Sequence, residues 1–199
     1  MTQNSRHPNH TTPPSLLLRI RDHHDDGAWD VFCDVYSPLL YDYCRKRGLQ
    51  ASDAADVVQE TLLRIAKGIV KFEYDQSKGR FRDWLYTILH NEIRRMLGRK
   101  KPTQELKSIA SDAAGQGGTW DEHFYEHILK SALERIQPRF ETDTWEAFTN
   151  VWLKNQAADE VAKLMERSID FVYLSKSRVL KRLRLEIDEL ADDAGLKHG

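Results

Sequence analysis

The sequence predicts an all-α protein made of two small helical domains joined by a flexible linker. First, apolar residues recur three and four positions apart, as at Val58, Leu62 and Ile65, which is the period of an amphipathic helix. Second, no stretch alternates apolar and polar residues as a half-buried strand does. Third, the polar, glycine-containing segment Thr103–Thr119 separates the two helical halves, as a linker would.

Four helices are expected before the linker. Ser15 caps a short first helix, and a longer one runs to Gly48, which suits its C-terminal cap. Pro38 predicts a kink or a restart within that longer helix. The third helix is capped by Ser52 and the fourth opens at Asp83, and each carries an apolar stripe at helical spacing.

The second half reads as a further set of helices. One is expected over Ile128–Ile136, and another near Pro138, because proline suits a first helical turn. A short helix over Ala157–Leu164, the turn Met165–Arg167 and a final helix capped by Ser168 follow. The expected boundaries are 1–14 for a disordered tail, 15–101 for the first domain, 102–124 for the linker, 125–190 for the second domain and 191–199 for a second tail.

Charge is concentrated rather than large. The formal net charge is −1, which does not by itself mark a nucleic-acid-binding protein. Basic residues nevertheless crowd into 94–101 and again into 176–184. Near-neutrality overall therefore requires acidic faces elsewhere, which can themselves be docking surfaces.

Cysteine usage and hydropathy indicate the compartment. Cys33 and Cys44 lie too far apart along one helix for a disulfide, so free thiols in a reducing cytosol are expected. No apolar run approaches the roughly 18–20 residues of a membrane span. We therefore expect a soluble, cytoplasmic protein without a membrane partner.

One helix carries an acidic face opposite its apolar stripe. The members of this face are Asp53, Asp56, Gln59 and Glu60. Such a face can dock on a basic protein partner. Acids in a first helical turn also stabilise the helix dipole while they stay solvated. The pattern alone leaves both interpretations open.

Aromatic and basic residues are interleaved over 72–101. Rings can stack on unpaired bases, at roughly 1–3 kcal/mol per base, while cations hold the phosphate backbone. The alternative is that Phe81 and Trp84 fill the core at a helix start. The candidate contacts are Lys78, Arg80, Phe81, Arg82, Trp84, Arg94 and Arg95.

The C-terminal elements have the spacing of a helix-turn-helix, with a short helix, a tight turn and a longer basic helix. Arginine can bind guanine through two hydrogen bonds, and lysine mostly contacts phosphate. An ordinary helical hairpin with a solvated basic face is the alternative. The residues that could reach a major groove are Phe171, Tyr173, Ser177, Arg178 and Lys181.

A single motif points to an enzyme. His123-Phe-Tyr-Glu-His127 matches the H-x-x-E-H arrangement in which two histidines bind zinc and the glutamate activates water. So short a pattern often arises by chance, and no phosphate loop or catalytic triad pattern accompanies it. We therefore expect a protein that is not an enzyme and has no metal or other cofactor.

Two parts of the chain closely resemble one bacterial family. Asp53-Ala-Ala-Asp-Val-Val-Gln-Glu-Thr-Leu-Leu, Phe72-Glu-Tyr-Asp and Gly79-Arg-Phe-Arg-Asp-Trp-Leu resemble domain 2 of the extracytoplasmic-function (ECF) sigma factors of the sigma-70 family. Val172-Tyr-Leu-Ser-Lys-Ser-Arg-Val-Leu-Lys-Arg-Leu-Arg184 looks like the recognition helix of their domain 4. The resemblance covers roughly residues 15–101 and 125–190, in the family's order.

The resemblance implies a sigma factor that binds core RNA polymerase and directs promoter recognition, promoter melting and transcription initiation. Helix Asp53–Ile65 would dock on the β′ clamp helices, and Phe72–Lys101 would open and read the −10 element, with Asn91 lining a pocket for a flipped base. The second domain would meet the β flap and place the helix-turn-helix residues in the −35 major groove. An anti-sigma factor is a further partner that the family allows.

The chain departs from the family in two places. Glu166 stands where the family usually has a glycine, and a left-handed non-glycine residue costs roughly 1 kcal/mol. Tyr173 stands where a lysine or arginine is common, so the −35 preference does not follow. The alternatives are a helix-turn-helix regulator that acts without polymerase and a small zinc hydrolase using His123, Glu126 and His127.

Overall fold

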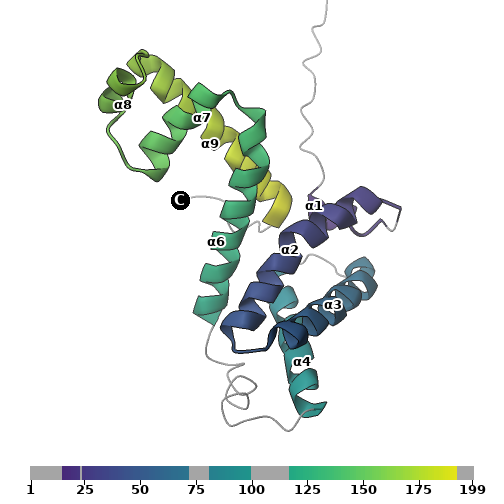
Figure 1. Cartoon of the computed structure of the whole chain (residues 1–199). Coiled ribbons are helices and arrows are strands. Elements are labelled where there is room, and N and C mark those ends of the chain that lie inside the picture. The colour runs from purple at the N-terminus through teal and green to yellow at the C-terminus, as the bar shows by residue number, and fades with distance from the viewer. Residues whose placement is uncertain (1–14, 23, 72–80, 100–116, 192–199) are drawn as a thin grey trace, which may run out of the picture.

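The computed structural model describes residues 15–22, 24–71, 81–99 and 117–191, and its regular elements are all helical (Figure 1). The all-α prediction is confirmed. The α-helices are α1 (Leu16–Arg19), α2 (Asp26–Lys46), α3 (Ala51–Gly68), α4 (Phe81–Arg99), α6 (Gly117–Ile136), α7 (Thr142–Phe148), α8 (Ala158–Leu164) and α9 (Ile169–Ala191). Short 3-10 turns follow α3 and α6 (Ile69–Lys71 and Gln137–Arg139), and a π-helical turn follows α7 (Thr149–Leu153). None of the described helices is both long and apolar enough to cross a membrane.

The ends of the first helices follow the expected chemistry in part. The Ser15 hydroxyl accepts a hydrogen bond from the Leu18 amide at 3.4 Å, and Gly48, at φ 87°, ends α2 in the left-handed conformation. Of the kink or restart expected at Pro38, the restart is wrong, because α2 continues through Pro38 as one helix. Its buried face on both sides of the proline compensates for the single lost hydrogen bond.

Two helix starts lie earlier than expected. α3 begins before Ser52, with Gln50 in the capping position in an extended conformation and without a side-chain cap. α4 begins at Phe81 rather than Asp83. Phe81 is buried in the core, and its packing favours two additional helical residues that the capping pattern does not reveal.

The larger difference is at α6. This helix begins at Gly117, within the segment expected to be a linker, although Gly117 and Gly118 disfavour a helix. Trp120 and Phe124 lie in the first turns of α6, and both are buried. The apolar area that they bury outweighs the cost of the two glycines. Residues 102–116 of the expected linker lie outside the described residues.

The helix-turn-helix geometry is present at the other end. The Ser168 hydroxyl accepts a hydrogen bond from the Phe171 amide at 3.1 Å, as expected of the cap of α9. Glu166 has φ 52°, so the turn between α8 and α9 does use a left-handed non-glycine residue. Val161 and Ala162 of α8 pack with Val172 of α9 in a small apolar cluster that fixes the angle between these helices.

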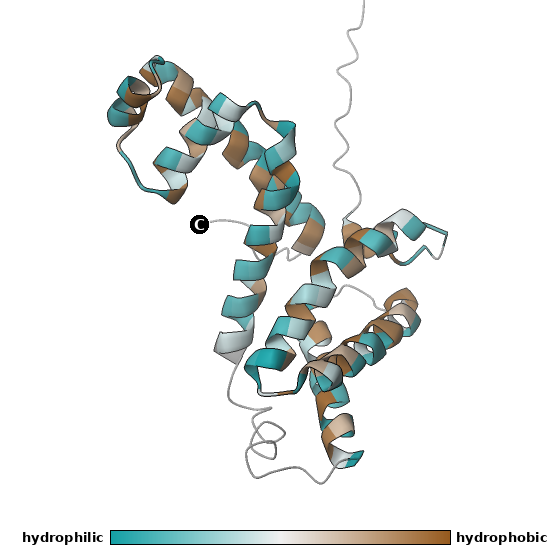
Figure 2. Ribbon diagram, viewed as in Figure 1, coloured by the Kyte–Doolittle hydropathy of each residue, from teal (hydrophilic) through white to brown (hydrophobic). Residues whose placement is uncertain are grey.

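One hydrophobic core joins both halves of the chain. Phe32 and Tyr36 of α2 stack at 4.4 Å, and Phe81 of α4 meets both rings edge-on. Trp120 and Phe124 of α6 belong to the same core. Figure 1 shows α6 running beside α2 and α9 returning beside α6, and Figure 2 shows hydrophobic and hydrophilic residues alternating along these helices. The division into two domains stays a prediction, but helices on its two sides share this core.

The cysteines are as expected. Cys33 and Cys44 are both free. Burial raises the pKa of the Cys44 thiol to about 12, so it stays protonated and behaves as a small apolar core residue.

Candidate protein- and nucleic-acid-binding surfaces

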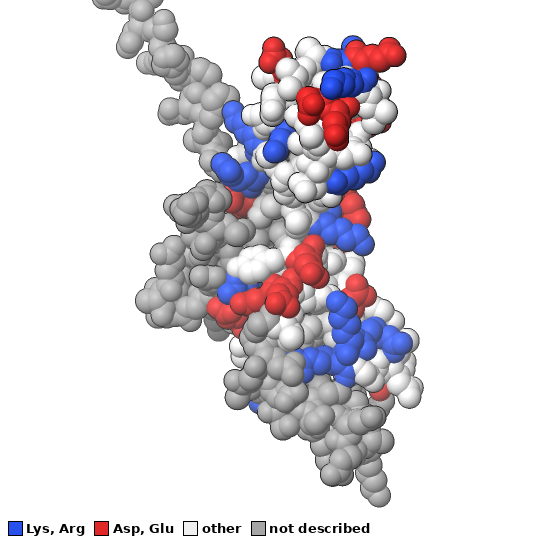
Figure 3. Space-filling view, turned by 90° about the vertical axis from the view of Figure 1, so that its left-hand side faces the viewer, with Lys and Arg blue, Asp and Glu red and all other residues white. Residues whose placement is uncertain are grey.

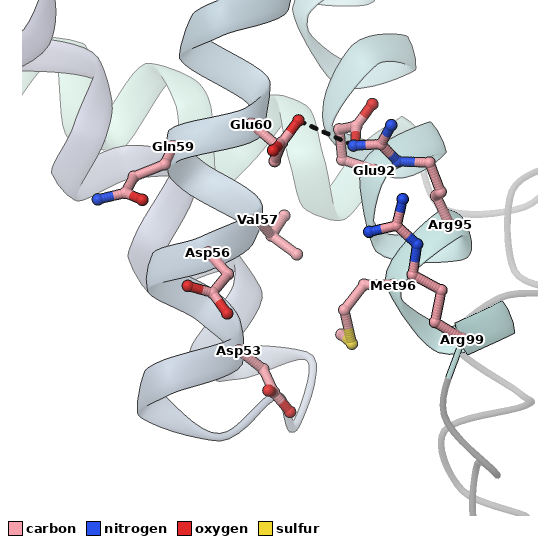
Figure 4. Close-up of a pocket in the computed structure, with 9 residues that line it drawn as sticks. All are labelled: Asp53, Asp56, Val57, Gln59, Glu60, Glu92, Arg95, Met96 and Arg99. Atoms are coloured by element: carbon pink, nitrogen blue, oxygen red, sulfur yellow. Dashed lines mark hydrogen bonds and ion pairs between the residues drawn. The ribbon is translucent and has the colours of Figure 1, made fainter.

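The predicted polymerase-binding residues line a cleft between α3 and α4. Asp53, Asp56, Gln59 and Glu60 lie along α3, with Arg95 and Arg99 across from them on α4 (Figure 4). The cleft has a volume of about 300 Å³. Asp56, Gln59 and Glu60 are exposed, so this acidic side of the cleft is open to a partner.

A buried carboxylate that the sequence did not single out organises this cleft. Glu92 of α4 is only 4 % exposed and pairs with two arginines, Arg64 of α3 and Arg95 of α4. Arg95 lies 2.7 Å from Glu92 and 2.8 Å from Glu60, so it bridges the two helices. The signal was present in the sequence: Glu92 falls on the apolar stripe of α4, one turn after Leu89.

Arg95 has a different environment from the one expected. It was predicted to hold a DNA phosphate, but the structure places it among the acids of the α3–α4 cleft. Two carboxylates already neutralise its charge, and a DNA strand would have to compete with them. Arg94, next to it, is exposed on α4, as is Asn91. Lys78 and Arg80 lie outside the described residues.

The aromatic candidates at the start of α4 contribute to packing. Phe81 is fully buried, 5.7 Å from the Tyr36 ring and 5.7 Å from the Trp84 ring. Trp84 is half-buried and covers Gly68 of α3, where an added methyl group would lie 3.0 Å from the indole ring. In this arrangement Phe81 presents no face to a base, and Trp84 can offer only its exposed part.

Arg82 is held by α6. Its Nε lies 2.9 Å from the Asp121 carboxylate, and its guanidinium lies 5.0 Å from the centre of the Tyr125 ring. The residue is only 8 % exposed. A second acid, Asp83, lies 3.6 Å away on α4. The predicted DNA contact is therefore occupied by groups from the other half of the chain.

The exposed face of α9 gathers most of the predicted −35 residues. Tyr173, Ser177 and Lys181 recur every four residues and line a shallow groove, which Lys176 and Arg184 extend. Arg178 is exposed on the neighbouring side of the helix. Phe171 differs: it packs against the cluster beneath the turn, and the Arg167 guanidinium lies over its ring at 5.5 Å. Lys176 and Arg184 belong to the basic run in the sequence, but their place on this face required the structure.

The histidines of the H-x-x-E-H motif face the first half of the chain. The Lys46 ammonium donates to His123 Nδ1 at 3.1 Å, and His127 Nε2 donates to the Val35 carbonyl at 2.7 Å. Each imidazole thus has one nitrogen engaged by α2. Across the described ranges, no group of three or more histidine, cysteine, aspartate or glutamate side chains is arranged to hold a metal ion.

Opposite charges are separated on the surface. Glu122 and Glu126 are exposed on α6. On the face shown in Figure 3, a group of acidic side chains lies in the middle with lysines and arginines above and below it, and acidic and basic side chains mix at the top. The net charge of −1 therefore conceals distinct acidic and basic patches.

Comparison with known protein families finds a match over the part of the chain that contains the α3–α4 cleft. Residues 33–103, which include α3 and α4, match the family model described as Sigma-70 region 2. The match supports a relation of this part of the chain to the sigma-70 family of transcription factors. It ends before α6, so the helix-turn-helix lies beyond it. None of the curated proteins compared with the chain matches it.

Proposed function

We propose that the chain is an ECF-type sigma factor that recruits core RNA polymerase to promoters in the cytoplasm and helps to melt them. The observation that carries the proposal is the Sigma-70 region 2 match over residues 33–103, followed in the same chain by a helix-turn-helix with an exposed basic face. The match supports polymerase and promoter binding. The exposed basic face of α9 supports a second DNA-binding element, which would follow the first in the order found in ECF sigma factors.

The proposed roles divide along the surfaces described above. The acids of the α3–α4 cleft would dock on the β′ clamp helices, and α4 would meet the −10 element through Arg94, Asn91 and, once released from α6, Arg82. Tyr173, Ser177, Arg178 and Lys181 of α9 would read the −35 element, and the body of this half would meet the β flap. The exposure of Asp56 and Glu60 on α3, of Asn91 and Arg94 on α4 and of the four α9 residues supports this division, whereas Arg82 is buried.

The primary test reconstitutes transcription. Purified chain is combined with core RNA polymerase and genomic DNA fragments, and transcript 5′ ends are mapped against a reaction without the chain. We expect co-purification with core and a set of specific start sites that share two upstream elements. No co-purification and no specific transcript would remove the proposal. Salt-sensitive duplex binding by the chain alone, again without transcripts, would favour the regulator acting without polymerase, for which the exposed α9 face is the supporting observation.

A charge reversal tests the docking surface. Asp56 is exposed and makes no ion pair with any described residue, so Asp56→Arg should leave the fold intact. It should weaken core polymerase binding by at least about tenfold, because like charges across an interface cost a few kcal/mol. Asp30→Arg, an equal change at an exposed site on α2, serves as the control. Equal binding by the two variants would move the docking surface elsewhere.

The α9 face is tested by sequence specificity. Arg178→Ala should weaken binding to the mapped −35 element by about 1–3 kcal/mol if Arg178 contacts a base, and much less on scrambled duplexes. Arg139→Ala, at an exposed site outside the helix-turn-helix, is the control. An equal loss on every sequence would make Arg178 a phosphate contact, which positions the helix without reading it.

A further inference from the structure

The first two turns of α9 expose apolar side chains. Ile169, Tyr173 and Leu174 are 42 %, 55 % and 54 % exposed. Single exposed apolar residues are common on protein surfaces, but three of them within residues 169–174 form a patch. In a helix-turn-helix, the N-terminal residues of the second helix are the ones that meet the edges of the bases. The patch therefore lies on the part of α9 that would enter a major groove.

The cations of α9 lie further along the helix. Residues 169–175 contain no lysine or arginine, and the basic run begins only at Lys176. Beyond it, Arg178 and Lys181 are exposed and can attract phosphates, which raises affinity without distinguishing one base from another. The charged residue of the first turn is Asp170, an acid, which repels phosphates. The start of α9 is thus suited to base edges and not to the DNA backbone.

Leu174 lies near the middle of the exposed face of α9. On a helix, the residues three and four positions away share the face of a given side chain. For Leu174 these neighbours include Asp170, Ser177 and Arg178, and all three are exposed. The opposite side of the helix is marked by Val172, which is fully buried in the cluster with α8. Leu174 therefore projects from the same face as the candidate DNA contacts.

The chemistry of the major groove favours one partner for a leucine. The C5-methyl group of thymine is the apolar group that base pairs present there, and the other edges present hydrogen-bond donors and acceptors. A leucine placed against a donor or acceptor displaces water without replacing its hydrogen bond, which is unfavourable. Placed against the methyl group, it removes apolar surface of both partners from water.

We propose that Leu174 reads the C5-methyl group of a thymine in the −35 element. The inference rests on the proposed function and names a base that this particular helix prefers. Leu174 forms no hydrogen bond through its side chain, so it distinguishes thymine from the other bases through the methyl group. Arg178 and Lys181, further along the same helix, supply the attraction to DNA that holds Leu174 in the groove.

Replacement of thymine by uracil tests the inference, because uracil lacks only this methyl group. Promoter duplexes are made from start sites mapped with the chain and core polymerase, and each thymine of the −35 element is replaced in turn. Binding of the complete holoenzyme is measured by competition with the unmodified promoter. We expect one replacement to weaken binding by about fourfold, as for the loss of one buried methyl group. Equal binding to every uracil duplex, or a −35 element without thymine on either strand, would overturn the inference.

A leucine-to-alanine change identifies the side chain. Leu174 is exposed and alanine favours helices, so Leu174→Ala should fold as the wild type does. The variant should bind the unmodified promoter at least about fourfold more weakly and should no longer distinguish uracil from thymine. Leu153→Ala, the same change at a 50 % exposed site in the π-helical turn, should keep the full discrimination. Undiminished discrimination by Leu174→Ala would overturn the assignment.

The inference and the proposed function fail in different ways. If the chain and core polymerase make no promoter-specific transcripts from unmodified DNA, the proposed function is wrong and the inference falls with it. If specific transcripts appear but binding does not depend on a thymine methyl group, only the inference is wrong.

Discussion

Two buried glutamates, Glu92 and Glu186, have the same arrangement of partners in the two halves of the chain. Each is almost inaccessible, and each pairs with one arginine from its own helix and one from a neighbouring helix. A carboxylate removed from water is costly, and its two arginine partners offset that cost while fixing the helix pair in one register. Glu92 thereby sets the separation of α3 and α4, and Glu186 that of α6 and α9.

The contribution of Glu92 can be measured by an isosteric change. Glu92→Gln removes the charge that Arg64 and Arg95 share, and charge-assisted hydrogen bonds of this kind contribute about 1.5–3 kcal/mol each. Because both arginines can turn toward water, we expect the free energy of unfolding to fall by only about 1–3 kcal/mol in urea denaturation. Glu60→Gln, which loses an exposed pair with Arg95, should cost less than about 1 kcal/mol. Equal losses would show that burial of Glu92 does not matter.

The left-handed turn at Glu166 offers a test in the stabilising direction. Its φ of 52° is a conformation that glycine adopts without strain, so Glu166→Gly should raise the free energy of unfolding by about 0.5–1 kcal/mol. Glu160→Gly, an exposed site within α8, should instead lower it by up to about 1 kcal/mol. Thermal unfolding of both variants provides the comparison. A loss of stability in Glu166→Gly would mean that the glutamate side chain has a role in the turn.

These residues also show how far the sequence could be read. Apolar spacing and caps predicted the helices and the Ser168 cap, because those depend on neighbours in the chain, while the left-handed turn at Glu166 followed from the family resemblance. They did not predict the burial of Glu92 or the partners of Arg82. An acid on an apolar stripe, or an arginine beside aromatics, has a role set by partners such as Arg64 and Asp121, from other elements. Only the packing of helices brings such partners together.

At the scale of elements, the largest difference between the prediction and the structure is the start of α6. The glycines at 115, 117 and 118 correctly mark a weak helix former. Trp120 and Phe124 make the segment helical because they find the rings of α2, and no local pattern announces that contact. The same contact between α6 and α2 accounts for the surroundings of the H-x-x-E-H histidines. His123 and His127 lie on the side of α6 that meets α2, where Lys46 and the Val35 carbonyl engage them.

The α2–α6 contact should depend on pH through His123. Burial first and the neighbouring Lys46 next lower the pKa of this imidazole from its ordinary value of 6.5. The ionisable groups around it are Asp42, Tyr43, Lys46 and Arg47 of α2 and Glu122, Glu126 and His127 of α6. If α6 separates from α2, the pKa of His123 returns toward 6.5, so the separated form takes up a proton more readily. Lowering the pH below 6.5 therefore favours separation of α6 from α2, and above that range the contribution of His123 no longer changes with pH.

Small-angle scattering across this range provides the measurement. The radius of gyration of the wild-type chain should grow as the pH falls from about 7.5 to about 5.5, since histidine titrates there. His123→Gln, which cannot be protonated, should remove most of this change. His24→Gln, at an exposed histidine far from α6, should leave it intact. A pH response that survives in His123→Gln would assign the effect to other groups.

At the scale of the whole molecule, the question is whether the chain behaves as one body or two. The expected linker predicts two independently stable domains, whereas the core runs without interruption from Phe32 and Phe81 to Trp120 and Phe124. Neither half is large, and small domains bury too little surface to be very stable alone. Burial in the shared core therefore contributes a substantial part of the stability of each half.

This reasoning predicts a single cooperative unfolding transition for the wild-type chain. Tryptophan fluorescence and far-ultraviolet circular dichroism should report the same midpoint in urea, the criterion for two-state behaviour. Trp120→Ala should separate the transitions, because it removes the largest fully buried side chain at the contact and leaves a cavity worth about 3–5 kcal/mol. Trp29→Ala, at a half-buried site that packs on Phe32 within the first half, should lower stability without uncoupling the two probes. Two transitions in the wild-type protein would instead mean that α6 separates from α2 before either half unfolds. The contact between the halves would then contribute little to stability in solution.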